Sequence, residues 1–493
     1  MDSSGAKGRL AWKPFAGIDA LVSLDPTAAP GASGEAARQQ SPPEESLPAP
    51  PSKSSLADSP ADMEDFLLKE SFAPRFQEQS RAELRRCLAE AEELQRSNRW
   101  DDILALFHPL EGKVPSVVDA GIDLGLRLKV AFALGQTGRF EEALKCLQPA
   151  LKLHPDDFWV HSAIGYNAYQ SLLKRDDRKV ALIPEQKRDR IRLAHHHFKC
   201  CQDLRPDHVT SFYREGMLYK EVEGKTVKAC DCFQKAIENW TALTEEQRTK
   251  RHQERPKYMR SLYHMASCLL SNKEPRRALD LMQRCFQEDQ TDVLSPVHKH
   301  FGMAKILYGL CRYQDALDHL ETAGLAAQAG EPTDYIWELA ARSALLLGKP
   351  EKGMDYLGRI PEKRRRHYVR WTESDLLVAL GRDAEAEQVL LRSAERDRRS
   401  RHRALMRLAQ LHYRQSDSSR ALQAAEQANR FCLDTFGNEC QDALFWRAAC
   451  LHRLGRLREA DQSLDDLQRL NPNYPNLCRL QERIRGGLMN GRT

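Results

Sequence analysis

Residues 134–155 read LGQTGRFEEALKCLQPALKLHP, a tight turn followed by one amphipathic helix. Gly138 suits a backbone turn that other residues enter only with strain, and Phe140 begins a run of apolar residues at helical spacing. Ala143 is small enough to let a neighbouring helix approach closely, and Pro155 ends the helix. The stretch therefore predicts the second half of an antiparallel helix pair.

Small and apolar residues recur along the chain at a spacing near that of helix-pair repeats, about 34 residues. The pattern resembles the tetratricopeptide repeat, in which two antiparallel helices form a unit and successive units stack. The resemblance implies an all-α fold, a right-handed α-solenoid of about ten helix-turn-helix repeats over residues 81–474. The marker residues of the other copies are Ala91, Trp100 and Phe107; Trp159, Ile164, Gly165 and Ala194; Gly216, Ala229 and Phe233; Leu262, Ala266 and Ala278; Ala304 and Ala316; Trp337, Ala341 and Gly353; Gly381 and Ala386; Ala409 and Ala421; and Ala448, Gly455 and Ala460.

Composition favours helices and excludes several classes of function. The 493 residues are 41% hydrophobic and 7% aromatic, and rich in residues that lose little entropy in helices. A net charge of +5 is too small over this length to imply a polyanionic partner. The 13 cysteines are scattered, and we find neither a secretory signal nor a membrane-spanning run, so we expect a cytoplasmic protein. Without a phosphate-binding glycine loop or a known nucleophile or metalloprotease motif, we expect no enzyme activity, no cofactor and no small-molecule substrate.

The N-terminal arm, residues 1–62, contains a Pro- and Ser-rich stretch with too few large apolar side chains to form a core, so we predict disorder. It carries an apolar island at residues 10–24, and an acidic amphipathic lead-in follows at residues 63–80. Two interpretations of the island stay open: a motif that docks on a partner or on the protein's own groove, or a cap that packs on the first repeat. The docking residues are Trp12, Phe15, Ile18 and Leu21.

Three segments depart from the repeat pattern. Charged insertions near residues 174–190 and 241–256 are expected to lengthen helices or to form loops on the rim of the solenoid. Residues 475–493 are expected to form a capping helix and tail, because the last repeat of a solenoid would otherwise expose an apolar face.

The family resemblance also implies a groove for a protein partner. One subgroup of the family grips a chaperone carboxylate with a Lys and an Asn one turn apart on the first helices of successive repeats. The corresponding positions here hold Leu128 and Phe132, Ser162 and Tyr166, Tyr213 and Met217, and Tyr263 and Ser267, so the clamp is absent. We expect instead a wall of aromatic and Met character for an amphipathic helix or an extended apolar peptide. The alternative is that these side chains pack against neighbouring helices. The groove residues are Leu128, Phe132, Tyr166, Tyr213, Met217 and Tyr263.

Basic residues outnumber acidic ones between residues 363 and 407, in two runs one repeat apart. Because successive repeat junctions stack on one edge of a solenoid, the runs predict a basic stripe that suits nucleic-acid phosphates or an acidic protein segment. The alternative is a solvated edge balanced by acidic neighbours. The stripe residues are Lys363, Arg364, Arg365, Arg366, Arg396, Arg398, Arg399, Arg401 and Arg403.

One cluster has the chemistry of metal ligands: His195, His196 and His197, followed by Cys200 and Cys201. On a helix His196 and Cys200 share one face and His197 and Cys201 another, so three ligands do not converge. We expect core cysteines beside exposed histidines and no metal site, with His196 and Cys200 as the ligands if one existed.

Two functional hypotheses follow. The first is a scaffold or adaptor that binds a protein segment in the groove and makes a second contact through the arm. The second is a nucleic-acid-associated or regulatory repeat protein that uses the basic stripe.

Overall fold

The computed structural model describes residues 60–173, 182–328 and 330–490, with side chains from residue 77 to residue 489. Every regular element in these ranges is helical, so the fold is the expected all-α stack of repeats. The described residues fall into two compact units. The N-terminal unit holds residues up to 274 together with 287–289, and the C-terminal unit holds residues 275–286 and 290–490.

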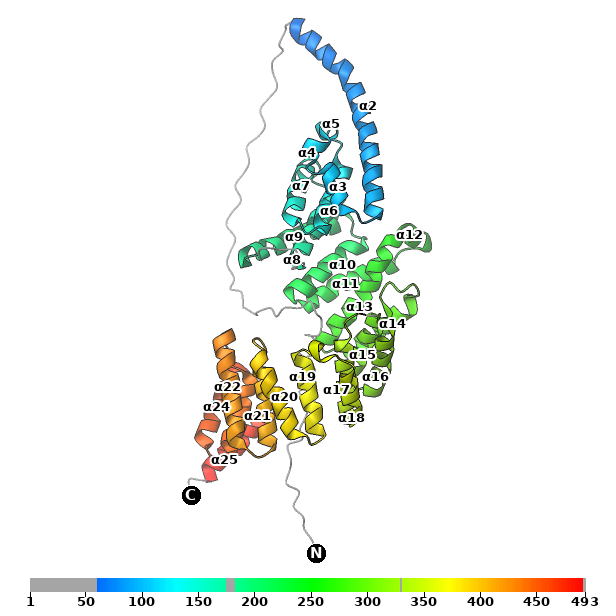
Figure 1. The fold of residues 1–493 in the computed structure, drawn as a ribbon. Coiled ribbons are helices and arrows are strands. Elements are labelled where there is room, and N and C mark those ends of the chain that lie inside the picture. Colours follow the sequence, from blue (N-terminus) through cyan, green and yellow to red (C-terminus); the bar gives the residue numbers. More distant parts are fainter. Residues whose placement is uncertain (1–59, 174–181, 329, 491–493) are drawn as a thin grey trace. The chain divides into compact units, whose positions relative to one another are not determined.

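The N-terminal unit contains α2 to α13 (Figure 1). The helix α2 runs without a break past residue 80, so the boundary expected there between lead-in and first repeat is not the end of an element. The helices are α2 (Pro60–Arg96), α3 (Trp100–Phe107), α4 (Leu110–Lys113), α5 (Pro115–Asp119), α6 (Leu124–Gln136), α7 (Phe140–Leu153), α8 (Phe158–Leu173), α9 (Pro184–Leu204), α10 (Val209–Met217), the π-helix η1 (Leu218–Glu223), α11 (Thr226–Thr241), α12 (Glu245–Lys250), the 3-10 helix η2 (His252–Glu254) and α13 (Arg255–Ser271).

The C-terminal unit begins in α14 and ends with α25. Its helices are α14 (Pro275–Glu288), α15 (Pro296–Gly309), α16 (Tyr313–Ala326), α17 (Asp334–Leu346), α18 (Pro350–Gly358), the 3-10 helix η3 (Glu362–Arg364), α19 (His367–Ala379), α20 (Asp383–Arg396), α21 (Arg401–Arg414), α22 (Ser418–Phe436), α23 (Gln441–Arg453), α24 (Leu457–Leu470) and α25 (Leu477–Asn490).

The helices pair and stack in a repeating order. Within a pair, α6 packs on α7, α8 on α9, α15 on α16 and α21 on α22. The second helix of a pair then packs on the first helix of the next, as α7 does on α8 and α20 on α21. The turn residue Gly138 has φ +79° and Ala143 is fully buried, so the stretch at residues 134–155 folds as its sequence predicts.

Contacts between successive repeats follow a register of one repeat length. The Nη2 atom of Arg342 donates to the Tyr308 hydroxyl at 3.2 Å across a sequence separation of 34 residues. The Tyr368 hydroxyl donates to Asp334 across the same separation, and the Thr372 hydroxyl donates to Glu338. Equivalent positions of neighbouring repeats therefore face each other.

The irregular segments are largely helical where the structure describes them. Residues 174–181 of the first insertion lie outside the described residues, and α9 begins at Pro184. The second insertion contains α12 and η2 and runs into α13. Trp159 was expected to open a repeat, but its side chain is 53% exposed and the preceding Phe158 occupies the buried position.

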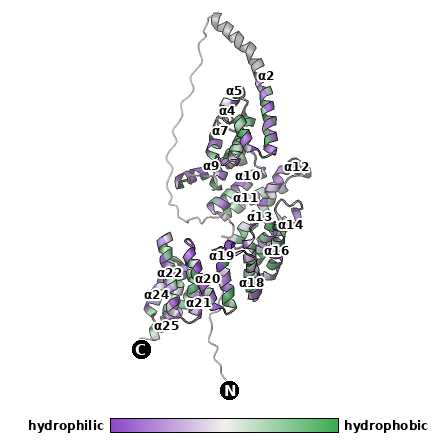
Figure 2. Cartoon of the chain, viewed as in Figure 1, coloured by the Kyte–Doolittle hydropathy of each residue, from purple (hydrophilic) through white to green (hydrophobic). Residues whose placement is uncertain are grey.

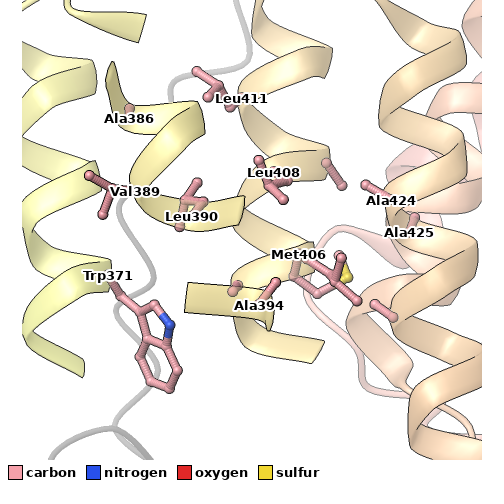
Figure 3. Close-up of a cluster of buried hydrophobic side chains, with 14 of the residues drawn as sticks. Trp371, Ala386, Val389, Leu390, Ala394, Met406, Leu408, Leu411, Ala424 and Ala425 are labelled. Carbon is pink, nitrogen blue, oxygen red and sulfur yellow. The ribbon is translucent and has the colours of Figure 1, made fainter. Parts of the chain in front are cut away.

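Apolar side chains between the helices form the core of each unit. In the C-terminal unit, Leu390 of α20 lies toward Leu408 of α21 (Figure 3), and Val389 belongs to the same cluster. Figure 2 shows hydrophilic residues over α12 and along the first turns of α9, whose side chains at residues 184–189 are exposed. The last helix, α25, packs on α24 through the fully buried Ile484.

Candidate functional site

Three half-buried rings of the N-terminal unit, one at the start of α3 and two on the first helices α6 and α8, form a row that we call the aromatic ladder. The ring of Trp100 on α3 meets that of Phe132 on α6 edge-on, with the centroids 5.5 Å apart. Phe132 stacks on Tyr166 of α8 with the centroids 6.3 Å apart. Such contacts fix each ring against its neighbour while leaving part of it open to solvent.

The predicted groove residues all lie on first helices of the N-terminal unit and are half-buried. The structure brings Phe132 and Tyr166 together, and both Tyr213 and Tyr263 contact the ring of His264. The remaining two pack partly into the core: Leu128 joins the cluster between α6 and α8, and Met217 the cluster around Tyr169.

Beside the ladder lie three basic side chains that the sequence pattern did not predict as a site, and we call them the cation cluster. The Cζ atom of Arg214 on α10 lies 4.5 Å from the ring centroid of Tyr166. The ammonium nitrogen of Lys257 on α13 lies 5.8 Å from the ring centroid of Tyr213, and Arg260 donates to the Tyr213 hydroxyl.

Two of these cations have pKa values below the ordinary values of their side chains. Burial lowers the pKa of Arg214, and burial together with the charges of Arg260 and Arg214 lowers the pKa of Lys257 to about 8. Arg214 directly follows the groove residue Tyr213, and Arg260 precedes Tyr263 by one helical turn. The basic residues beside the aromatic positions were therefore the feature of the sequence from which the cation cluster could have been predicted.

A second polar network surrounds the π-helix η1. His195 of α9 places Nδ1 2.9 Å from Glu215 and Nε2 2.7 Å from Glu223. Gln202 and Lys225 donate in turn to these two carboxylates. Burial lowers the pKa of His195, but the hydrogen bonds to both glutamates outweigh burial and leave it raised. An imidazolium donating from both nitrogens is the form that this geometry favours.

The histidine run differs from the expectation of exposed side chains. Only His196 is exposed; His195 is half-buried, and His197 is buried with its Nδ1 2.7 Å from that of His161. The predicted ligand pair, His196 and Cys200, has a nitrogen–sulfur distance of 3.8 Å. Within the described ranges, no group of three His, Cys, Asp or Glu side chains is placed to hold a metal ion.

The two basic runs lie at neighbouring repeat junctions of the C-terminal unit. They are linked where His367 approaches Asp397, with 3.6 Å between Nδ1 and Oδ2. Two residues of the basic stripe already interact with other side chains: Arg365 pairs with Glu373 at 3.2 Å, and Arg403 lies over the ring of Trp371.

Most other members of the basic stripe are exposed and uncompensated. Arg366 has one distant partner, Asp334, at 3.8 Å. The rest form no ion pair with a residue that the structure describes: Lys363, Arg364, Arg396, Arg398, Arg399 and Arg401.

The arm residues Trp12, Phe15, Ile18 and Leu21 lie outside the described residues. Among the helices that the structure does describe, none combines the length and the apolar character that crossing a membrane requires.

Comparisons with known proteins agree on the repeat. Models of the tetratricopeptide repeat match residues 210–240, 372–432 and 442–474. A search of curated proteins gave no match.

Several solved structures resemble the chain. A tetratricopeptide repeat protein from Parabacteroides merdae is 12% identical, with a TM-score of 0.44, over 56% of this chain and 98% of that one. PilF of Pseudomonas aeruginosa is 14% identical, with a TM-score of 0.36, over 47% and 88%. Human IFIT1, solved as a dimer with m7Gppp-AAAA, is 13% identical, with a TM-score of 0.40, over 81% and 88%.

The matched stretches lie in both units and coincide with helix pairs of the stack, α10/α11 in one unit and α19 to α24 in the other. Both units of this chain therefore contain tetratricopeptide repeats.

Proposed function

We propose that the chain is a protein-interaction scaffold or adaptor that binds an extended segment of a partner along the aromatic ladder. The observation that carries the proposal is the ladder itself, in which Phe132 contacts both Trp100 and Tyr166 and all three rings stay half-open to solvent. Rigid aromatic side chains supply large contact area at a low entropic cost and dominate many interfaces. A binding role rather than a catalytic one is part of this proposal.

Site-specific photo-crosslinking tests the proposal. A photoreactive phenylalanine derivative replaces Phe132 in one variant and Tyr263 in another, and the linked partner peptides are mapped by mass spectrometry. We expect both positions to link to neighbouring segments of the same partner. The control is the derivative at Leu325, which is 84% exposed on α16 of the other unit. Equal crosslinking yields of the same partner at all three positions would show that the partner does not bind specifically along the aromatic ladder.

An alanine substitution gives a second test of whether the partner binds along the aromatic ladder. Phe132→Ala should weaken partner binding about tenfold or more, because it removes the central ring of the ladder. Phe436→Ala, at a half-exposed ring in the other unit, is the matched control. Unchanged affinity in the first variant would remove the ladder from the interface.

The N-terminal arm is proposed as a second contact, through Trp12, Phe15, Ile18 and Leu21. Deleting residues 1–62 separates the two ways in which it could act. A fall in affinity indicates that the arm binds the partner, and a rise indicates that it occupies the protein's own binding face.

Nucleic-acid binding by the basic stripe is a second candidate, favoured by the six exposed cations without acidic partners among the described residues. Binding of single-stranded RNA should then weaken steeply with salt and disappear when Arg364, Arg366, Arg398 and Arg399 are changed to Glu. The control carries the same change to Glu at four exposed basic residues of the other unit, Lys145, Lys152, Lys187 and Arg188. Equal losses in both variants would indicate an effect of net charge alone.

A further inference from the structure

The cation cluster lacks the counter-charge that other half-buried cations of this protein have. In the C-terminal unit Arg342 lies 3.8 Å from Glu338, and Arg407 lies 3.4 Å from Asp375. In the N-terminal unit the buried Arg127 pairs with Asp123 at 2.6 Å. In these three cases a carboxylate within 4 Å compensates the cation.

Arg214, Lys257 and Arg260 have only neutral partners among the residues that the structure describes. Arg214 donates Nη1 to the Ser162 hydroxyl at 2.9 Å and lies over Tyr166. Lys257 and Arg260 both meet Tyr213.

The acidic side chain recorded near Tyr213 is already engaged. Glu221 pairs with Lys220 at 2.7 Å, which leaves the cluster without a compensating charge. Withdrawing cations from water without an anion costs free energy, so a ligand that brings negative charge recovers it.

The donors that remain suit a multivalent oxyanion. A guanidinium carries five N–H donors, and one of them in Arg214 has a hydrogen-bond partner in the structure. Three cations carry more positive charge than the single negative charge of a carboxylate can balance. They also have more N–H donors than its two oxygens can accept. A phosphoryl monoester offers three oxygens and a charge of about −1.5 to −2 near neutral pH, and arginine forks match its geometry.

We propose that Arg214, Lys257 and Arg260 form a binding site for a doubly charged phosphoryl group carried on a peptide side chain. The proposal rests on the proposed function, because the peptide is the segment that we place along the aromatic ladder. The ladder would take apolar side chains next to the phosphorylated residue, since Tyr166 belongs to both the ladder and the surroundings of Arg214.

Lys257 gives the site a characteristic pH dependence. The charged groups that act on it are Arg260 on its own helix and Arg214 of α10. Its ammonium nitrogen also lies over the ring of Tyr213, and the charges of Lys220 and Glu221 of η1 act on that tyrosine. The Lys257 pKa of about 8 means that the ammonium charge is lost as the pH rises through that value. Phosphoryl binding should therefore weaken above pH 8, and also below about pH 6, where a phosphomonoester takes up a proton.

The test is a titration of the full chain with phenyl phosphate, followed by phosphorus-31 NMR. Phenylacetate, read by proton NMR, supplies the singly charged comparison, and inorganic phosphate supplies the dianion without an organic group. We expect phenyl phosphate to bind at least about tenfold more tightly than phenylacetate. Tighter binding of phenyl phosphate than of inorganic phosphate indicates a ligand carried on a side chain, and equal binding indicates free phosphate as the source.

Three variants assign the binding to the cluster. Lys257→Met should weaken phenyl phosphate binding about tenfold, by loss of one charge-assisted contact. Lys257→Arg should keep the affinity but lose the weakening above pH 8, because a guanidinium stays charged there. Lys145→Met, at an exposed lysine of α7, should change neither.

Four outcomes overturn the proposal: no binding of phenyl phosphate, binding that Lys257→Met leaves unchanged, phenylacetate binding as tightly, or displacement by equimolar single-stranded oligothymidylate, which would indicate a nucleic-acid ligand. The crosslinking experiment separates this proposal from the proposed function. A partner that links at position 132 while phenyl phosphate fails to bind leaves the scaffold function standing and removes the phosphoryl site.

Discussion

At the scale of single residues, glycine allows rings to cross the helix interface where a methyl group would not fit. A Cβ atom added at Gly216 would lie 2.7 Å from Cε1 of Phe233, and one added at Gly165 would lie 2.9 Å from the ring of Phe198. Both rings are buried and cannot swing away cheaply. The close approach of α10 to α11 thus depends on the absence of a side chain.

Gly216→Ala should lower the free energy of unfolding of the N-terminal unit by about 1–3 kcal/mol, because the methyl group overpacks against Phe233. Urea unfolding followed by circular dichroism measures the change. Gly112→Ala, where an added methyl group meets no atom within 4 Å, is the control and should be neutral or stabilising. Equal midpoints for the two variants would show that α10 and α11 relax to accept the methyl group.

The His195 network predicts a dependence of stability on pH. The raised pKa of His195 means that the folded state holds the proton more tightly than the unfolded state, whose value is near 6.5. Its stabilising contribution is therefore complete below pH 6.5 and is lost as the pH rises through the folded-state pKa. His195→Gln should flatten this decline in urea midpoints measured from pH 6 to pH 9. His154→Gln, at an exposed histidine, should leave the profile as it is.

At the scale of elements, α25 closes the apolar end of the stack. Leu477 and Ile484 are buried against α23 and α24, while Met489 at the end of the helix is 71% exposed. A terminal helix with one apolar face and one polar face lets a repeat array end in water.

Ile484→Ala should destabilise the last repeat by about 2–5 kcal/mol, through lost burial and the cavity left behind. Met489→Ala, in the same helix but exposed, should cost far less. Thermal unfolding of both variants measures the difference. If the two had the same effect, α25 would not contribute to the core.

The sequence predicted elements better than contacts, for a physical reason. Helix pairs follow from local periodicity and turn chemistry, which is why Gly138 and Ala143 lie where the pattern places them. The partners of His197 and Arg214 depend on how separate repeats come together, so their surroundings were not predicted. The π-helix η1 left no signal that we recognise, although Gly224 after it adopts the left-handed conformation (φ +67°) that ends it.

At the scale of the whole molecule, we expect each repeat to be stabilised mainly by the repeats next to it in the chain. Each helix pair packs mainly on the pairs beside it in the chain, so the free energy is close to a sum of repeat and interface contributions. A local defect should then stay local.

Hydrogen exchange checks this expectation in the full chain. Ile484→Ala should speed amide exchange in α23 to α25 and leave α6 to α8 unchanged, and Leu126→Ala, at a fully buried position of α6, should do the reverse. Faster exchange along the entire chain in either variant would indicate a single cooperative fold instead.

The register of 34 residues between Tyr308 and Arg342, and between Asp334 and Tyr368, has a consequence for how such a chain can change its length. Duplicating or excising a segment of one full period, cut at equivalent points, leaves each helix beside a neighbour of the same kind. Losing a single residue inside a helix instead rotates everything after it by about 100°. Tandem duplication can therefore lengthen the stack of repeats in whole steps, whereas small insertions are tolerated only at the junctions.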